Sequence, residues 1–128
     1  MAQGSATLHE DASALRRETI ERHRAIVSLM EELEAVDWYD QRVDATTDEA
    51  LREVLRHNRD EEKEHASMTL EWLRRHDPVL DRHLRTYLFT DTPIVGIEEE
   101  AEAEGRGEPG GTRPTSLGIG ALRDKEAV

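Results

Sequence analysis

The feature that most constrains the fold is a long segment without glycine or proline, from Thr7 to Ala45. These two residues disfavour a helix interior more than any others, so their absence allows one long helix. Apolar side chains recur along the segment at helical spacing, at Leu15, Ile26, Leu29, Leu33 and Val36. We therefore expect a helix that begins between Thr7 and Ser13 and ends near Tyr39, with Thr7-x-x-Glu10 as a candidate capping box.

A second long helix is expected after a short connection, Asp44 to Thr47, because Thr46-x-x-Glu49 matches a capping box. Its apolar face is formed by Leu51, Val54, Leu55, Met68, Trp72 and Leu73. The Asp77-Pro78 pair should end it, since proline has no amide hydrogen to donate. Pro78 also suits the first turn of a short third helix that Asp77 caps.

The chain has too few apolar residues to form a core by itself. Hydrophobic residues make up 36% and aromatic residues 4% of its 128 residues, and the mean hydropathy is -0.77. A short connection makes the two long helices an antiparallel hairpin, and two helices cannot enclose a core between them. We therefore predict an all-α fold, an antiparallel two-helix hairpin plus a short C-terminal helix, that dimerises into a four-helix bundle.

Charge and composition exclude several classes of function. The formal net charge is -12, which disfavours nucleic acid and anionic membranes as partners and favours cations. The chain has no cysteine, so disulfides, thiolate zinc sites and iron–sulfur clusters are excluded. We see neither a signal peptide nor an apolar run of the roughly 20 residues that a membrane helix needs. The expected location is the cytoplasm.

Three ionisable residues interrupt the apolar faces of the two long helices. Glu62 and His65 lie on the stripe that continues from Leu55 to Trp72, and Glu32 lies on the stripe of the first helix, between Leu29 and Val36. A buried carboxylate without a partner costs several kcal/mol or takes up a proton. A metal ion supplies the opposing charge.

The three residues amount to half of a known ligand set. Di-iron carboxylate bundles use one Glu from each of two helices and Glu-x-x-His from each of the other two, and this hairpin supplies one of each. A two-fold dimer would supply the rest. Oxygen and imidazole ligands suit iron, and they also admit manganese, zinc or cobalt. The alternative is an ordinary solvated helix face, with His65 packed and bonded to Glu62 or Glu61.

Four neighbouring residues have two interpretations each. Glu31 and Glu34 flank Glu32 but point away from it by helical geometry; they form either a solvated acidic face or a cation entry path and outer metal site. Trp38 and Tyr39 serve packing by default, and a redox or gating role near the metal is the alternative.

The composition changes after Thr92-Pro93. Residues 96–116 are rich in Glu, Gly, Ala and Pro, which is typical of a flexible acidic linker. A small apolar segment follows, from Leu117 to Leu122. It is either a frayed terminus or a docking peptide whose leucines and isoleucine fill apolar pockets of a partner. We accordingly divide the chain into a helical domain (1–95), a linker (96–116) and a targeting peptide (117–128).

Three segments together resemble a known family. They are RAIVSLMEELEAVDWYDQR at 24–42, HNRDEEKEHA with LEWL at 57–66 and 70–73, and SLGIG at 116–120. The first two resemble the helix signatures of the encapsulated ferritins of bacterial encapsulin nanocompartments. The third resembles the peptide by which such cargo is loaded. The similarity of the helical part covers about residues 20–95.

The resemblance implies a ferroxidase that oxidises Fe(II) to Fe(III) at a di-iron centre formed across a dimer interface. The dimer would be a ferritin-like four-helix bundle, with Glu32, Glu62 and His65 as the ligands. A separate hypothesis makes Glu62 of both chains the bridge between the two irons and Glu32 and His65 the terminal ligands. Glu31 and Glu34 would form the entry or secondary site, and Trp38 would lie near the centre. Five dimers would close into a ring-shaped decamer inside an encapsulin shell that stores the iron and is reached through Leu117–Leu122. The rival interpretations are a non-catalytic helical adaptor and a metal buffer or manganese protein of the same fold.

Overall fold

The computed structural model describes residues 7–107, which form one 3-10 helix and four α-helices. The chain divides into two compact units, Met1–Asp77 and Pro78–Val128. Among the residues described, no helix combines the length and the apolar character needed to cross a membrane.

The first long helix, α2, spans Arg17–Ala45 and follows a short 3-10 helix, η1, at Ala12–Ala14. The expected start between Thr7 and Ser13 is therefore wrong, as is the end near Tyr39. Asp11, rather than Thr7, makes the capping contact, because its side chain accepts a hydrogen bond from the Ser13 amide at 3.0 Å and initiates only η1. The extended backbone of Leu15 and Arg16 then separates η1 from α2.

The second long helix, α3, spans Glu49–Arg75. The predicted Thr46–Glu49 capping box is wrong: Asp48 is the N-cap, and its carboxylate accepts from the Leu51 amide at 3.1 Å. Thr46 instead accepts from the Asp48 amide at 3.2 Å, within the turn. Arg52 closes the turn by donating to the carbonyl oxygen of Val43 at 3.0 Å and to that of Thr46.

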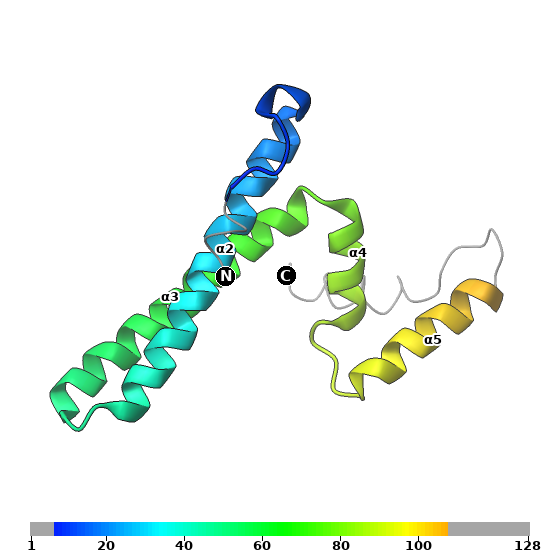
Figure 1. The fold of residues 1–128 in the computed structure, drawn as a ribbon. Coiled ribbons are helices and arrows are strands. Elements are labelled where there is room, and N and C mark those ends of the chain that lie inside the picture. Colours follow the sequence, from blue (N-terminus) through cyan, green and yellow to red (C-terminus); the bar gives the residue numbers. More distant parts are fainter. Residues whose placement is uncertain (1–6, 108–128) are drawn as a thin grey trace, which may run out of the picture. The chain divides into compact units, whose positions relative to one another are not determined.

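Helices α2 and α3 lie side by side as an antiparallel hairpin, which confirms the predicted fold of one chain (Figure 1). The hairpin buries little: Val43, Ala66 and Leu73 are its only buried hydrophobic residues within the described part of the chain. The two helices alone leave much of their apolar stripes exposed, as expected for a hairpin that cannot enclose a core. The following large side chains are 46–59% exposed: Ile26, Leu33, Leu51, Val54 and Met68. The predicted dimeric bundle would cover such stripes and stays a prediction.

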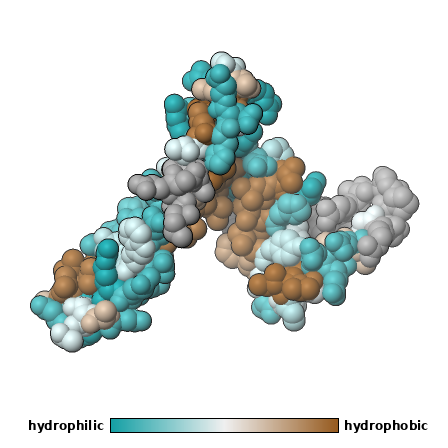
Figure 2. All heavy atoms as spheres, in the orientation of Figure 1, coloured by the Kyte–Doolittle hydropathy of each residue, from teal (hydrophilic) through white to brown (hydrophobic). Residues whose placement is uncertain are grey.

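The second unit contains α4 (Pro78–Tyr87) and α5 (Ile94–Gly107), which contact each other. Helix α4 begins at Pro78, as predicted. The flexible linker expected from Gly96 is wrong as far as residue 107, because those residues are helical. Ala and Glu favour helix, and Ile97 is buried at 9% exposure. Figure 2 shows apolar side chains at the surface of α4, where Val79 is 54% exposed.

An ion pair joins the two helices of the hairpin, and others lie within α3. Arg59 on α3 reaches Asp40 on α2 at 3.1 Å and its neighbour Asp60 at 3.2 Å. Hydrogen bonds to Asp60 and Asp40 raise the pKa of Arg59. Near the end of α3, Arg74 donates to both oxygens of Glu71, at 2.8 and 2.7 Å, and Arg75 donates at 2.7 Å. These hydrogen bonds lower the pKa of Glu71 to about 2, from an ordinary 4.5.

Replacing Glu71 with Gln should lower the free energy of unfolding near neutral pH by only about 0.5 kcal/mol, because a 41% exposed side chain is screened by water. The pKa of Glu71 is lower in the folded state than in the unfolded state, so its contribution is complete above the ordinary value of 4.5. It is lost as the pH falls toward about 2. Urea unfolding of both proteins over a pH series measures this, with Glu64→Gln on the same helix as control. A wild-type advantage that does not shrink in acid would contradict the assignment.

Candidate metal centre

Glu32 lies in the middle of α2 and is half-buried against α3. The hydroxyl of Thr69 on α3 donates a hydrogen bond to Oε2 of Glu32 at 3.0 Å. This contact joins residues 37 positions apart and crosses from one helix to the other. The carboxylate of Glu32 is therefore held at the junction of the two helices, on the side of α3 that carries His65 and Thr69.

Glu62 and His65 are one turn apart on α3. Oε1 of Glu62 and Nδ1 of His65 are separated by 3.8 Å, and the two side chains are 27% and 44% exposed. That separation is too long for a hydrogen bond and within reach of an ion pair when His65 is protonated. Glu61, the other partner considered for His65, pairs instead with His57 at 3.3 Å.

The described part of one chain does not bring three or more metal-binding side chains into a single cluster. It does place an imidazole nitrogen and carboxylate oxygens on neighbouring, partly exposed positions of the hairpin. These donor types suit iron, manganese, zinc or cobalt, so the residues present fit one half of a shared metal centre. Because these side chains are partly exposed, a metal bound to them could also take ligands from a second chain. Fully buried side chains would not allow this.

The flanking acidic residues differ in exposure. Glu31 is exposed and Glu34 is half-buried, while Glu32 between them is half-buried as well. Because a helix turns by about 100° per residue, Glu31 and Glu32 leave α2 in different directions. Their predicted role as an entry or outer site stays a prediction.

Trp38 and Tyr39 share one cationic neighbour. The guanidinium carbon of Arg42 lies 5.9 Å from the centroid of the Trp38 ring and 5.5 Å from that of Tyr39, within the range of a cation–π contact. Trp38 is 48% exposed, so packing inside a single chain does not account for it. Both side chains lie on α2 between the candidate ligand Glu32 and the turn.

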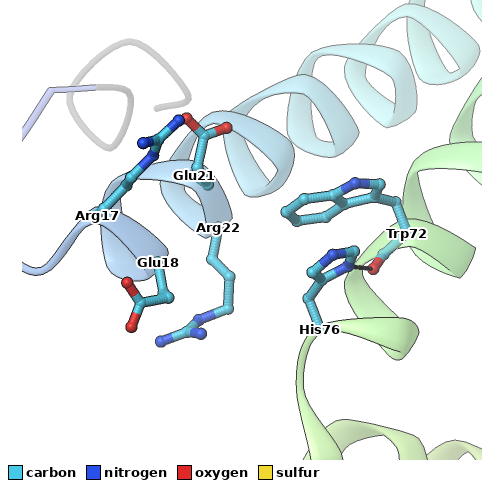
Figure 3. Close-up of a pocket in the computed structure, with 6 residues that line it drawn as sticks. All are labelled: Arg17, Glu18, Glu21, Arg22, Trp72 and His76. Carbon is cyan, nitrogen blue, oxygen red and sulfur yellow. Dashed lines mark hydrogen bonds between the residues drawn. The ribbon is translucent and has the colours of Figure 1, made fainter.

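A surface pocket of about 240 Å³ lies elsewhere in the first unit, where the start of α2 faces the end of α3 (Figure 3). The rings of Trp72 and His76 stack there, with centroids 3.8 Å apart and an angle of 15° between the planes. Six residues line the pocket: Arg17, Glu18, Glu21, Arg22, Trp72 and His76. None of the candidate ligands is among them, so the pocket is separate from the candidate metal centre.

Thr69 is the residue that sequence reasoning missed. Thr69 comes seven residues after Glu62 and four residues after His65, so it lies on the same face of α3. This helical spacing was the only sign in the sequence that Thr69 lies near the candidate ligands. Nothing in the sequence, however, shows which α2 residue faces a given α3 residue. The apolar segment Leu117–Leu122 lies outside the described residues.

A family model described as EncFtn-like matches residues 7–91 of the chain. An encapsulated ferritin-like protein from Rhodospirillum rubrum is 58% identical over 134 residues, which cover 100% of this chain and 96% of that protein. The encapsulin nanocompartment cargo protein EncC of Myxococcus xanthus is 30% identical over 99 residues, covering 72% of this chain and 76% of EncC.

The fold also matches a solved structure. The crystal structure of protein ne0167 from Nitrosomonas europaea aligns with a TM-score of 0.66 and 59% sequence identity. The alignment covers 68% of this chain and 96% of that one. The shared part is therefore long enough to contain the whole hairpin, in which all the candidate ligands lie.

Proposed function

The chain belongs to the EncFtn-like family of encapsulated ferritin-like proteins, and from this premise we propose that it is a ferroxidase that oxidises Fe(II) to Fe(III). The proposed active site is a di-iron centre at the interface of two chains, each of which contributes Glu32, Glu62 and His65. The observation that carries the proposal is the hydrogen bond that Thr69, four residues after His65 on α3, donates to the carboxylate of Glu32 on α2. One carboxylate from each helix and one imidazole are thus available, each on a side chain that the single chain leaves partly exposed.

We propose a role for each of the three side chains. A carboxylate has two oxygens and can bridge two cations, and Glu62 of both chains is the proposed bridge. Glu32 and the imidazole of His65 are proposed as terminal ligands. Two Fe(II) ions held there would each give up one electron, and the pair would reduce dioxygen to hydrogen peroxide with two protons from the solvent. The role of the protein would be to hold both ions close together and to balance their charge.

Two-fold association is the part of the proposal that the exposed apolar residues support. Leu33 on α2 and Met68 on α3 are 53% and 59% exposed. A second hairpin would cover these side chains and bring the second half of the ligand set. We further propose that five such dimers form a decamer ring, as the family resemblance implies.

The proposed location is the interior of an encapsulin compartment in the cytoplasm. The R. rubrum relative is named as encapsulated and the M. xanthus relative as an encapsulin nanocompartment cargo. We propose that Leu117–Leu122 docks on the shell protein, and that the shell stores the iron that this protein oxidises. Glu31 and Glu34 are proposed to guide Fe(II) toward the centre, with Trp38 and Tyr39 nearby.

Alanine substitution of Glu32, Glu62 or His65 should abolish fast Fe(II) oxidation, because each removes a ligand from both halves of the centre. Stopped-flow absorbance of the Fe(III) product, with oxygen uptake in parallel, measures the rate. Glu64→Ala is the matched control, since this exposed residue lies on α3 beside His65 and should oxidise iron at the wild-type rate. Circular dichroism should report the same helix content in all four variants. Unchanged kinetics in the three ligand variants would sink the proposal and favour a non-catalytic adaptor.

Iron binding should require two chains. Anaerobic addition of Fe(II), followed by native mass spectrometry, should show iron bound to dimers or larger assemblies, with one di-iron site per pair of chains. Replacing Leu33 with Glu should shift the population toward monomers and reduce iron binding with it, because the charge opposes burial of this exposed leucine in an interface. Iron retained by monomers at full stoichiometry would contradict a shared centre.

Deletion of Leu117–Val128 should abolish co-purification with the encapsulin shell protein and leave Fe(II) oxidation unchanged, because the ligands lie far away in sequence. The measurement is co-expression with the shell followed by size-exclusion chromatography and gel analysis. Persistent loading of the truncated chain would show that another segment docks on the shell.

A further inference from the structure

The hydroxyl of Thr69 lies between two groups that both belong to the candidate ligand residues. It is 3.0 Å from Oε2 of Glu32 on α2 and 3.1 Å from the backbone carbonyl oxygen of His65 on its own helix. Both neighbours are hydrogen-bond acceptors, and a threonine hydroxyl has one proton to give. The hydroxyl can therefore donate to the carboxylate or to the carbonyl, or divide one hydrogen between them.

The two donations have different consequences for Glu32. When Thr69 donates to Oε2, this oxygen is fixed on the α3 side, and Oε1 remains to face a cation. When Thr69 donates to the carbonyl of His65, both oxygens of Glu32 are released. In the second case the hydroxyl still has an acceptor, the carbonyl oxygen of His65. Glu32 can therefore change its orientation without leaving the partly buried hydroxyl of Thr69 without a hydrogen bond.

A threonine bonded to the carbonyl four residues earlier is common in helices and needs no functional reason. Thr86 does this with Arg82 at 3.0 Å, and Ser67 does it with Lys63 at 2.8 Å. Thr69 differs from both because its oxygen also contacts a carboxylate on another helix. A purely local role accounts for the bond to His65 and leaves the contact with Glu32 unexplained.

We propose that Thr69 is a positioning residue that holds Glu32 in its metal-binding orientation before the metal arrives; this rests on the proposed ligand role of Glu32. A free glutamate side chain has three rotatable bonds and loses conformational entropy when a ligand fixes it. A hydrogen bond that fixes it beforehand lowers that loss. Partners that orient metal ligands in this way typically contribute about 10- to 100-fold to metal affinity or activity.

The test compares Thr69→Val, which keeps the shape and removes the hydroxyl, with Thr69→Ser, which keeps the hydroxyl. Thr86→Val is the matched control, because it removes a hydroxyl that bonds only to a backbone carbonyl. The full-length proteins are titrated with Co²⁺ under anaerobic conditions, and the visible absorption of the bound ion gives both affinity and ligand geometry. Fe(II) oxidation is measured on the same samples.

Thr69→Val should weaken Co²⁺ binding by about tenfold or more and change the absorption spectrum, while Thr69→Ser and Thr86→Val bind as the wild type does. Circular dichroism should show that helix content is retained. Should Thr69→Val fail to fold, Thr69→Ala and Thr69→Ser take its place, and the alanine variant should be the weaker binder. Equal affinity in the variants with and without the hydroxyl would overturn the positioning role.

Glu32→Ala distinguishes this inference from the proposed function. If Glu32→Ala loses Co²⁺ binding and Thr69→Val does not, the ligand set stands and only the role of Thr69 is wrong. If Glu32→Ala binds Co²⁺ as the wild type does, Glu32 is not a ligand, and both proposals are wrong.

Discussion

Two antiparallel helices share a single contact face, and this limits what the hairpin can bury. Helices α2 and α3 cover Val43, Ala66 and Leu73, while large apolar side chains such as Leu33 and Met68 stay exposed on both helices. Each exposed apolar surface of this kind leaves a favourable burial energy of about 25 cal/mol per Å² unused. The arrangement of the candidate ligands depends on the same limit, because a hairpin that closed its own core would have no open face on which to present them.

The electrostatics of that face point in the same direction. The chain carries a net charge of -12, and several of its carboxylates belong to ion pairs, as Glu71 does with Arg74 and Arg75. Glu32 is held differently, by a neutral hydroxyl, which orients a carboxylate without cancelling its charge. A cation between two hairpins would therefore be attracted by the carboxylate of Glu32. An arginine in place of Thr69 would weaken this attraction, because its positive charge would offset that of the carboxylate.

The sequence predicted the parts of this structure that depend on long-range periodicity. The two long helices, their antiparallel pairing and the start of α4 at Pro78 follow from apolar spacing, from the short connection and from the chemistry of proline. Helix ends were predicted less well, because Thr7, Asp11, Thr46 and Asp48 can all act as caps, and local geometry decides between them. Helix α5 was missed because an acidic, glycine-containing segment has the composition of a linker, and the burial of Ile97 is not visible in composition. The contact between Thr69 and Glu32 depends on the rotation of both helices about their axes, which one sequence does not reveal.

Assembly and metal binding would depend on each other if each chain supplies half of the centre. A ligand that binds only the associated state stabilises it by mass action, and by the same linkage association raises the affinity for the metal. The side chains of Glu62 and His65 are 27% and 44% exposed in one chain, which leaves room for a second chain to cover them. Thr69 adds a step within one chain, because it can hold Glu32 before either the metal or the second chain is present. The cost of ordering the carboxylate would then fall on the folding of the hairpin rather than on the binding of iron.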